Sequence, residues 1–251
     1  MGLFDYFSAE ASGARKRKAC LKKLSNMYYQ KADRLAAAEM AADLAARGDR
    51  EAIGVLLHRF EHLAPSTTND REEKKFVHDL LVSLGEPAAE VTREFIRTTD
   101  NPVYWPLRVI RNLSGKDAYL DFLADLLRSM DTEYVRDPEK KRNLMMIADD
   151  HPHPDIHQAL LPFVADEDET VRFNAIQTLA NAQRADGVDG LRESLQPRLA
   201  GEEESLRVAR RIAEIFAEQG WTIDEDAREA VASELHEDFK LVNGRVVRNA
   251  A

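Results

Sequence analysis

A pattern of two short amphipathic helices joined by a polar turn recurs along this chain and constrains its fold more than any other feature. Residues 166–199 show it most clearly, with two apolar stripes of helical spacing on either side of the polar stretch "NAQRADG". The first helices of the repeating units are predicted to end near Leu44, Leu84, Leu113, Ile147, Leu179 and Ile215. The second helices are predicted over residues 50–63, 87–99, 116–130, 154–165, 188–199 and 224–236. Because one pair cannot bury its own apolar face, consecutive pairs must stack, and the pattern predicts an all-α, right-handed α-solenoid of about six helix pairs.

The segment "DEDETVRFNAIQTLA" resembles the first helix of a bacterial HEAT or HEAT-like (PBS-lyase-type) repeat. It has Asp168 in an acidic turn, followed by Val171–Arg172, Ala175 and Leu179 in the places of the family signature. The resemblance covers residues 28–236 and implies a stack of HEAT-like helix pairs with a long concave surface. Such a surface has no preformed catalytic pocket, so the resemblance implies a non-enzymatic scaffold that binds a protein partner.

Three regions are predicted along the chain. Residues 1–27 form a basic, amphipathic N-terminal segment, residues 28–236 the HEAT-like repeat domain, and residues 237–251 a C-terminal tail. In the tail, Asn243–Gly244 separates two short β-branched and apolar stretches, which is the strongest short signal for a hairpin. We expect this small hairpin to cap the last helix pair or to be partly disordered.

The charge of the chain is unevenly distributed. The sequence has 35 Lys and Arg against 45 Asp and Glu, a net charge of −10. Residues 1–34 hold eight basic and three acidic side chains, which leaves −15 for the remainder. The six predicted second helices, which would line the concave face, hold nine basic and fifteen acidic residues. This acidity argues against nucleic acid as a ligand and favours a protein partner with a basic segment.

Exposed acidic positions on the second helices are the predicted partner-binding residues. They are Glu90, Glu94, Asp121, Asp125, Glu193 and Glu229.

Histidines cluster in "DDHPHPDIH", residues 149–157, and raise the question of a metal site. His153 and His157 are four residues apart, but Pro154 and a helix start lie between them. We therefore interpret the cluster of His151, His153 and His157 as a solvated turn, with His157 inside the helix that follows it, and predict neither a metal nor any other cofactor. His58 and His62 are also four apart, but Glu61 does not follow the first of them as in an HExxH zinc motif.

Enzymes built from similar repeats are the alternative to a scaffold. Di-iron hydroxylases of this architecture use several His-Glu dipeptides, whereas this chain has one, His236–Glu237. Alkylpurine DNA glycosylases use a Trp, an Asp and an Arg in a basic groove, which Trp105, Asp100 and Arg108 superficially match. The acidity of the predicted groove argues against this activity, so we expect Trp105 to serve in packing. Bilin lyases have no strict residue signature to place here, and no catalytic residue is predicted.

The N-terminal segment offers a further alternative, a peripheral membrane adaptor. Leu3, Phe4 and Phe7 share a helical face and precede a basic run, a combination found in membrane-targeting segments. We favour the interpretation that the aromatic residues cap the first helix pair and that the basic run is a solvated linker. Cys20, the only cysteine, lies in this run, and we expect a small packed residue rather than a reactive thiol. No disulfide within the chain and no apolar run of membrane-spanning length exist, which predicts a cytoplasmic protein.

Overall fold

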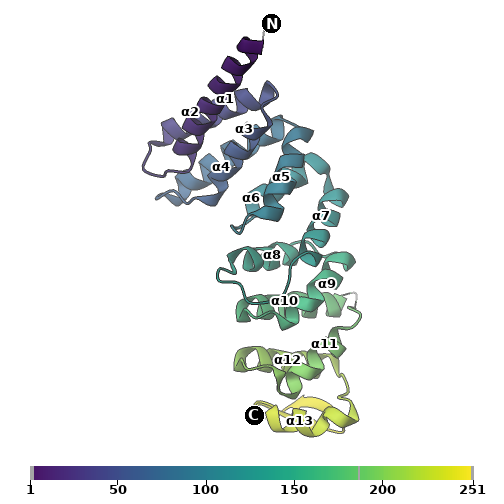
Figure 1. Cartoon of the computed structure of the whole chain (residues 1–251). Coiled ribbons are helices and arrows are strands. Elements are labelled where there is room, and N and C mark those ends of the chain that lie inside the picture. The colour runs from purple at the N-terminus through teal and green to yellow at the C-terminus, as the bar shows by residue number, and fades with distance from the viewer. Residues whose placement is uncertain (1–2, 186, 250–251) are drawn as a thin grey trace. The chain divides into compact units, whose positions relative to one another are not determined.

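A computed structural model describes residues 3–185 and 187–249, with side chains from residue 10 onward. These residues form a mostly helical protein, 72% helix in thirteen α-helices, with one two-stranded antiparallel sheet near the C-terminus (Figure 1). The prediction of a helical protein with a small C-terminal hairpin is therefore confirmed. The chain divides into two compact units, Met1–Tyr119 and Leu120–Ala251, and the division falls inside α7 (Lys116–Arg128). One continuous repeat domain over residues 28–236 stays a prediction.

The N-terminal unit is built from consecutive helices that pack on their neighbours along the chain. After α1 (Leu3–Leu24) come α2 (Lys31–Ala46), α3 (Arg50–Leu57) with the 3-10 turn η1 (His58–Glu61), α4 (Thr67–Ser83), α5 (Glu86–Thr98) and α6 (Tyr104–Ser114). Asp49 and Ser66 cap α3 and α4 by accepting hydrogen bonds from backbone N–H groups of the first turn, which sets where these helices begin.

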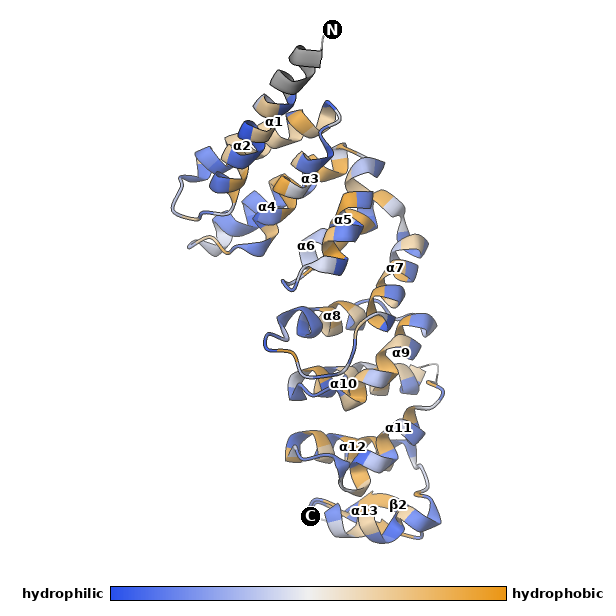
Figure 2. Cartoon of the chain, in the orientation of Figure 1, coloured by the Kyte–Doolittle hydropathy of each residue, from blue (hydrophilic) through white to orange (hydrophobic). Residues whose placement is uncertain are grey.

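Small residues on α2 allow its neighbours to approach closely. Ala37, Ala38 and Ala41 are buried in the same apolar cluster as Leu24 of α1 and Leu56 of α3. Figure 2 shows that the helices carry both hydrophobic and hydrophilic stretches, as expected where one side packs and the other faces water.

In the C-terminal unit, longer and shorter helices alternate. It contains α8 (Glu139–Asp149), α9 (Pro154–Leu160) with η2 (Leu161–Ala165), α10 (Glu169–Ala185), α11 (Leu191–Pro197) with the π-turn η3 (Arg198–Glu202), α12 (Leu206–Gln219), η4 (Glu225–Ala227) and α13 (Arg228–Glu234). Fully buried apolar side chains from successive helices form its core, including Leu160, Ile176, Leu195 and Phe216. None of the described helices combines the length and the apolar character needed to cross a bilayer.

The hairpin consists of β1 (Phe239–Val242) and β2 (Arg245–Arg248), with Val242 opposite Arg245. Asn243 and Gly244 both have positive φ, 50° and 74°, as a two-residue turn of this hand requires. Phe239 and Val246 are buried, and the strands contact α13 and α12. The predicted packing of the hairpin on the last helix pair is confirmed.

Two expectations were wrong in detail. The basic run is not a linker, because α1 continues through it to Leu24 and buries Cys20 and Leu24. The side chains of Leu3, Phe4 and Phe7 lie outside the described residues. The helix predicted to end near Leu179 continues to Ala185, because Ala180 and Ala182 still face the core and Gln183 accepts a hydrogen bond from Val188 N at 2.7 Å.

Candidate functional site

Buried ion pairs connect successive helices of the N-terminal unit. Glu73 of α4 accepts two hydrogen bonds from Arg34 of α2, at 2.8 and 2.6 Å, and one from Arg59 of η1 at 3.0 Å. Arg59 also donates to Asp70 at 2.7 Å. Burial alone would raise the pKa of Glu73, but the two guanidinium groups outweigh it and hold this pKa below its usual value. These charges have structural partners and hold the ends of three helices together.

The C-terminal unit repeats this arrangement where α10 begins. Lys141 of α8 is buried and donates to Asp166 at 2.8 Å, while Arg142 makes two hydrogen bonds to Asp168 at 3.1 and 2.7 Å. Burial raises the pKa of Asp166 even though Lys141 opposes this effect. The pKa of Asp168, which is less buried and accepts hydrogen bonds from Arg142, is lowered.

A second buried carboxylate lies one helix pair further along, before α12. Glu203 has a fully buried side chain and accepts hydrogen bonds from Arg172 of α10 at 3.1 and 2.8 Å and from Arg198 of η3 at 3.0 and 2.7 Å. The backbone N–H of Ser205 adds a fifth, at 3.0 Å. Burial would raise the pKa of Glu203, but these donors lower it, so the group is held as a carboxylate between two guanidinium groups.

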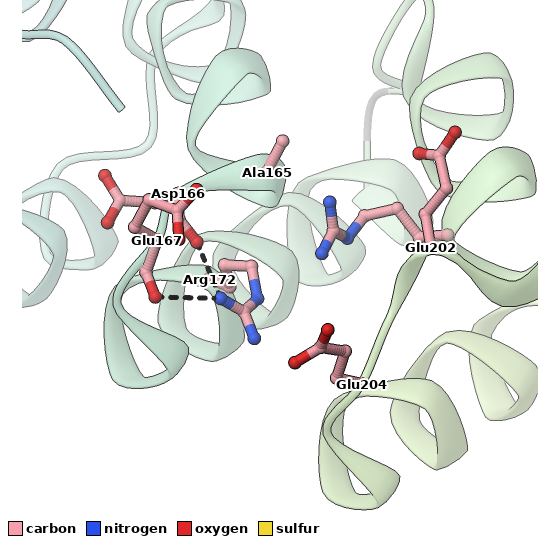
Figure 3. Close-up of a pocket in the computed structure, with 7 residues that line it drawn as sticks. Ala165, Asp166, Glu167, Arg172, Glu202 and Glu204 are labelled. Carbon is pink, nitrogen blue, oxygen red and sulfur yellow. Dashed lines mark hydrogen bonds between the residues drawn. The ribbon is translucent and has the colours of Figure 1, made fainter. Parts of the chain in front are cut away.

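The two guanidinium groups form part of a polar pocket of about 390 Å³ in the C-terminal unit. Figure 3 shows Asp166, Glu167 and Arg172 on one side of this pocket and Glu202 and Glu204 on the other. Arg172 donates to the backbone carbonyls of Asp166 and Glu167 at 2.7 and 3.1 Å, which fixes its guanidinium group (Figure 3).

The carboxylates at the rim of this pocket differ from those beneath it. Glu167, Glu202 and Glu204 are exposed, and their carboxylates have no ion pair with any described residue. With Lys141 and the buried Glu203 included, the pocket brings three cations and five carboxylates together, a net charge of −2. The arrangement is suited to a cationic group that approaches from solvent, while the arginines below offer donors to a carbonyl oxygen of the same ligand.

The six acidic residues predicted to bind a partner are all exposed. Glu90, Asp125 and Glu193 form ion pairs with Arg50, Arg128 and Arg192, at 2.7, 3.1 and 3.0 Å. Glu94, Asp121 and Glu229 have no ion pair with a described residue. Glu90 and Glu94 belong to the N-terminal unit and the other four to the C-terminal unit. Their role in binding stays a prediction.

The histidine cluster serves the local structure of α9. The Nδ1 atom of His153 accepts a hydrogen bond from Asp155 N at 3.3 Å and so caps this helix, and His157 is buried in its next turn. His58, in the N-terminal unit, contacts Glu61 at 2.5 Å. Among the described residues, no group of three or more His, Cys, Asp or Glu side chains is placed to hold a metal ion.

Trp105 lies in an aromatic cluster of the N-terminal unit. Its ring stacks on Phe60 with centroids 6.2 Å apart, and the guanidinium carbon of Arg108 is 5.1 Å from its centroid. Asp100 is exposed three residues before the buried Val103. These contacts are those of a packed aromatic side chain.

Sequence reasoning missed the pocket. The acidic run "GEEES" gave no signal for it, because nothing in the sequence shows that the central Glu203 is buried whereas Glu202 and Glu204 on either side are exposed. Helix capping accounts for Ser205 and Asp168, which accept hydrogen bonds from backbone N–H groups at the starts of α12 and α10, but not for Glu203, which pairs with two arginines. Comparison of the chain with protein-family models, with curated proteins and with solved structures finds no match in any of the three.

Proposed function

We propose that this protein is a non-enzymatic adaptor that binds a basic segment of a protein partner at the polar pocket of its C-terminal unit. The observation that supports this proposal is the set of three exposed carboxylates, Glu167, Glu202 and Glu204, around a floor of two immobilised arginines. The helix pairs of the chain would then be HEAT-like repeats of a right-handed α-solenoid, a fold that presents such surfaces.

The distribution of charge between the two units favours a basic ligand. The C-terminal unit has sixteen Lys and Arg against twenty-eight Asp and Glu, a net charge of −12, whereas the N-terminal unit has nineteen against seventeen, or +2. A field of this size raises the rate at which a cationic segment finds the surface and disfavours acidic partners. The predicted residues Asp121, Asp125, Glu193 and Glu229 contribute to this field.

A basic peptide would contact both the carboxylates at the rim of the pocket and the arginines at its floor. An arginine or lysine of the partner pairs with Glu202 and Glu204, and a backbone carbonyl of the same peptide accepts a hydrogen bond from Arg198. The side chains of Arg172 and Arg198 are only 12% and 11% exposed and both are held by Glu203. Because these donors are fixed before binding, little side-chain entropy is lost when the peptide arrives.

The buried ionisable groups serve the packing of the helices, which supports a non-enzymatic function. Asp70, Glu73, Asp166 and Glu203 each neutralise a buried or largely buried cation and hold the start of a helix against its neighbour. A carboxylate that already accepts several fixed hydrogen bonds is a poor general base, because its pKa and its orientation serve another purpose.

The proposal is tested by fluorescence anisotropy with a short, labelled, unstructured peptide of alternating arginine and serine. We expect binding that weakens with salt, and no binding of a matched glutamate–serine peptide. Glu202→Gln/Glu204→Gln removes two exposed charges and should raise Kd about tenfold, at roughly 0.5–1 kcal/mol for each charge.

The control variant is Glu225→Gln/Asp226→Asn, which removes two exposed charges of the same unit away from the pocket. It should leave Kd within a factor of about two, since only the general field changes. Equal effects of the two double variants, or tight binding of the acidic peptide, would contradict a specific basic site at the pocket.

A further inference from the structure

The solvent-facing side of α1 carries a stripe of unpaired cations. Arg15, Lys18 and Lys22 are exposed and follow the spacing of one helical face, opposite the buried Cys20 and Leu24. None of the three has an ion pair with a described residue. At 1.5 Å of rise per residue, the first and last of these positions are about 10 Å apart along the helix axis.

The helix that presents this stripe is firmly attached to its unit. Arg17, on the inner side, contacts Asp49 and Glu51 at 2.6 Å each. Leu24 is buried in the core shared with α2 and α3. Arg17, which faces the protein, is therefore neutralised by it. The three cations on the outer face have no ion pair with a described residue, and the anchored helix fixes the row in which they lie.

We propose that this stripe of one copy docks onto the polar pocket in the C-terminal unit of a second copy. The inference rests on the proposed function, since it names the basic segment that the pocket takes. The two surfaces are complementary in charge. The stripe has three unpaired cations on a unit of net charge +2, and the pocket has three unpaired carboxylates, Glu167, Glu202 and Glu204, on a unit of net charge −12. A folded helix loses less conformational freedom on docking than a flexible segment does.

This contact is heterologous, because each copy contributes a stripe to one neighbour and a pocket to another. Head-to-tail contacts of this kind close into rings or grow into open chains. Association should therefore depend on protein concentration and continue beyond the dimer. It should weaken at high salt, because the contact is made by charges at the surface.

Sedimentation velocity of the full chain tests the inference. The measurement covers about a hundredfold range of protein concentration at low ionic strength and is repeated at about 1 M salt. We expect the average mass to rise with concentration at low salt and to return to that of the monomer at high salt. The stripe variant, Arg15→Gln/Lys18→Gln/Lys22→Gln, and the pocket variant, Glu202→Gln/Glu204→Gln, should each stay monomeric.

Mixing the two variants gives the sharpest outcome. The stripe of the pocket variant and the pocket of the stripe variant are both intact, so an equimolar mixture should form two-copy complexes that grow no further. The control is Arg71→Gln/Arg111→Gln/Lys116→Gln, which removes three exposed cations of the same unit away from α1 and should associate as the unmodified chain does.

Other outcomes overturn the inference. A chain that remains monomeric at low salt refutes it, and if the arginine–serine peptide still binds the pocket, the proposed function survives without it. Self-association of the stripe variant at the level of the unmodified chain also refutes it. A third outcome is that sedimentation shows only monomer, while the full chain floats with anionic lipid vesicles and the stripe variant does not. This outcome would assign the stripe to a lipid surface instead.

Discussion

Replacing Glu203 by glutamine tests the physical basis of the pocket. The carboxylate is fully buried and accepts five hydrogen bonds, four of them from the guanidinium groups of Arg172 and Arg198. The substitution Glu203→Gln preserves the size of the side chain but removes its charge. The NH₂ group of the new amide then faces the N–H donors of the arginines, where the carboxylate had accepted hydrogen bonds. Two guanidinium groups are then left near each other without a counterion.

The expected loss of stability follows from the burial of those groups. Removing one partner of a buried ion pair costs about 3–5 kcal/mol. The side chains of Arg172 and Arg198 retain 12% and 11% exposure, so water relieves part of the cost and we expect the lower end, about 3 kcal/mol. With a urea dependence of about 2 kcal/mol per molar for a unit of this size, the midpoint of unfolding should fall by about 1.5 M.

Tryptophan fluorescence can follow each unit separately. Trp221 packs on Phe216 in the same unit as Glu203, and Trp105 lies in the other unit. In a Trp105→Phe background, urea unfolding followed through Trp221 reports the C-terminal unit alone. The control Glu204→Gln removes the neighbouring exposed carboxylate and should shift the midpoint by less than about 0.3 M.

The effect of Glu203→Gln should also depend on pH. The pKa of Glu203 is lowered in the folded protein, so its stabilising contribution is complete above the ordinary glutamate value of about 4.3 and is lost as pH falls through the lowered pKa. The difference between variant and unmodified chain should thus stay constant from neutral pH down to about 5 and shrink below 4. A midpoint shift under about 0.5 M at neutral pH, or an equal shift in Glu204→Gln, would refute the reasoning.

Three further substitutions or reactions test other parts of the structure. The hydroxyl of Thr92 is buried and has no hydrogen-bond partner among the described residues. Thr92→Val should therefore raise the free energy of unfolding by about 1 kcal/mol in urea titrations, and a decrease would contradict this. Burial raises the pKa of the Cys20 thiol, with Lys23 opposing only in part, so a disulfide reagent should modify the native chain at least about tenfold more slowly than the urea-unfolded chain; equal rates would contradict this. Gly244→Ala forces a side chain into a residue with φ of 74° and places its Cβ 3.0 Å from Arg228 Nε, so thermal unfolding should reveal a loss of about 1–2 kcal/mol, and unchanged stability would argue against the hairpin turn.

Local patterns in the sequence were enough to locate the helices but not all of their ends, since α10 continues six residues beyond the predicted Leu179. The spacing of apolar residues located α10 and α12, because each buries one stripe of side chains and the stripe has the period of a helix. The Asn243–Gly244 turn was identified for a similar reason, since the turn itself requires positive φ at both positions. The short 3-10 turn η2 was not anticipated; Pro162 lies within it, and a proline lacks the N–H donor that a continuing helix needs.

The candidate site could not be predicted in the same way, because it depends on residues that are far apart in the sequence. Arg172 and Glu203 are 31 residues apart, and nothing in either local segment indicates that they pair. The sequence did indicate an acidic protein and exposed acidic positions such as Glu229. It did not distinguish the buried Glu203 from its exposed neighbours, since that difference arises only when η3 and α10 pack together.

Hydrogen exchange of the full chain with and without the arginine–serine peptide tests the central claim most directly. If a basic segment binds the pocket, backbone amides of residues 165–170 and 201–206 should exchange more slowly in the complex, while those of the N-terminal unit keep their rates. Slower exchange confined to the N-terminal unit, under conditions where the peptide is bound, would contradict the account.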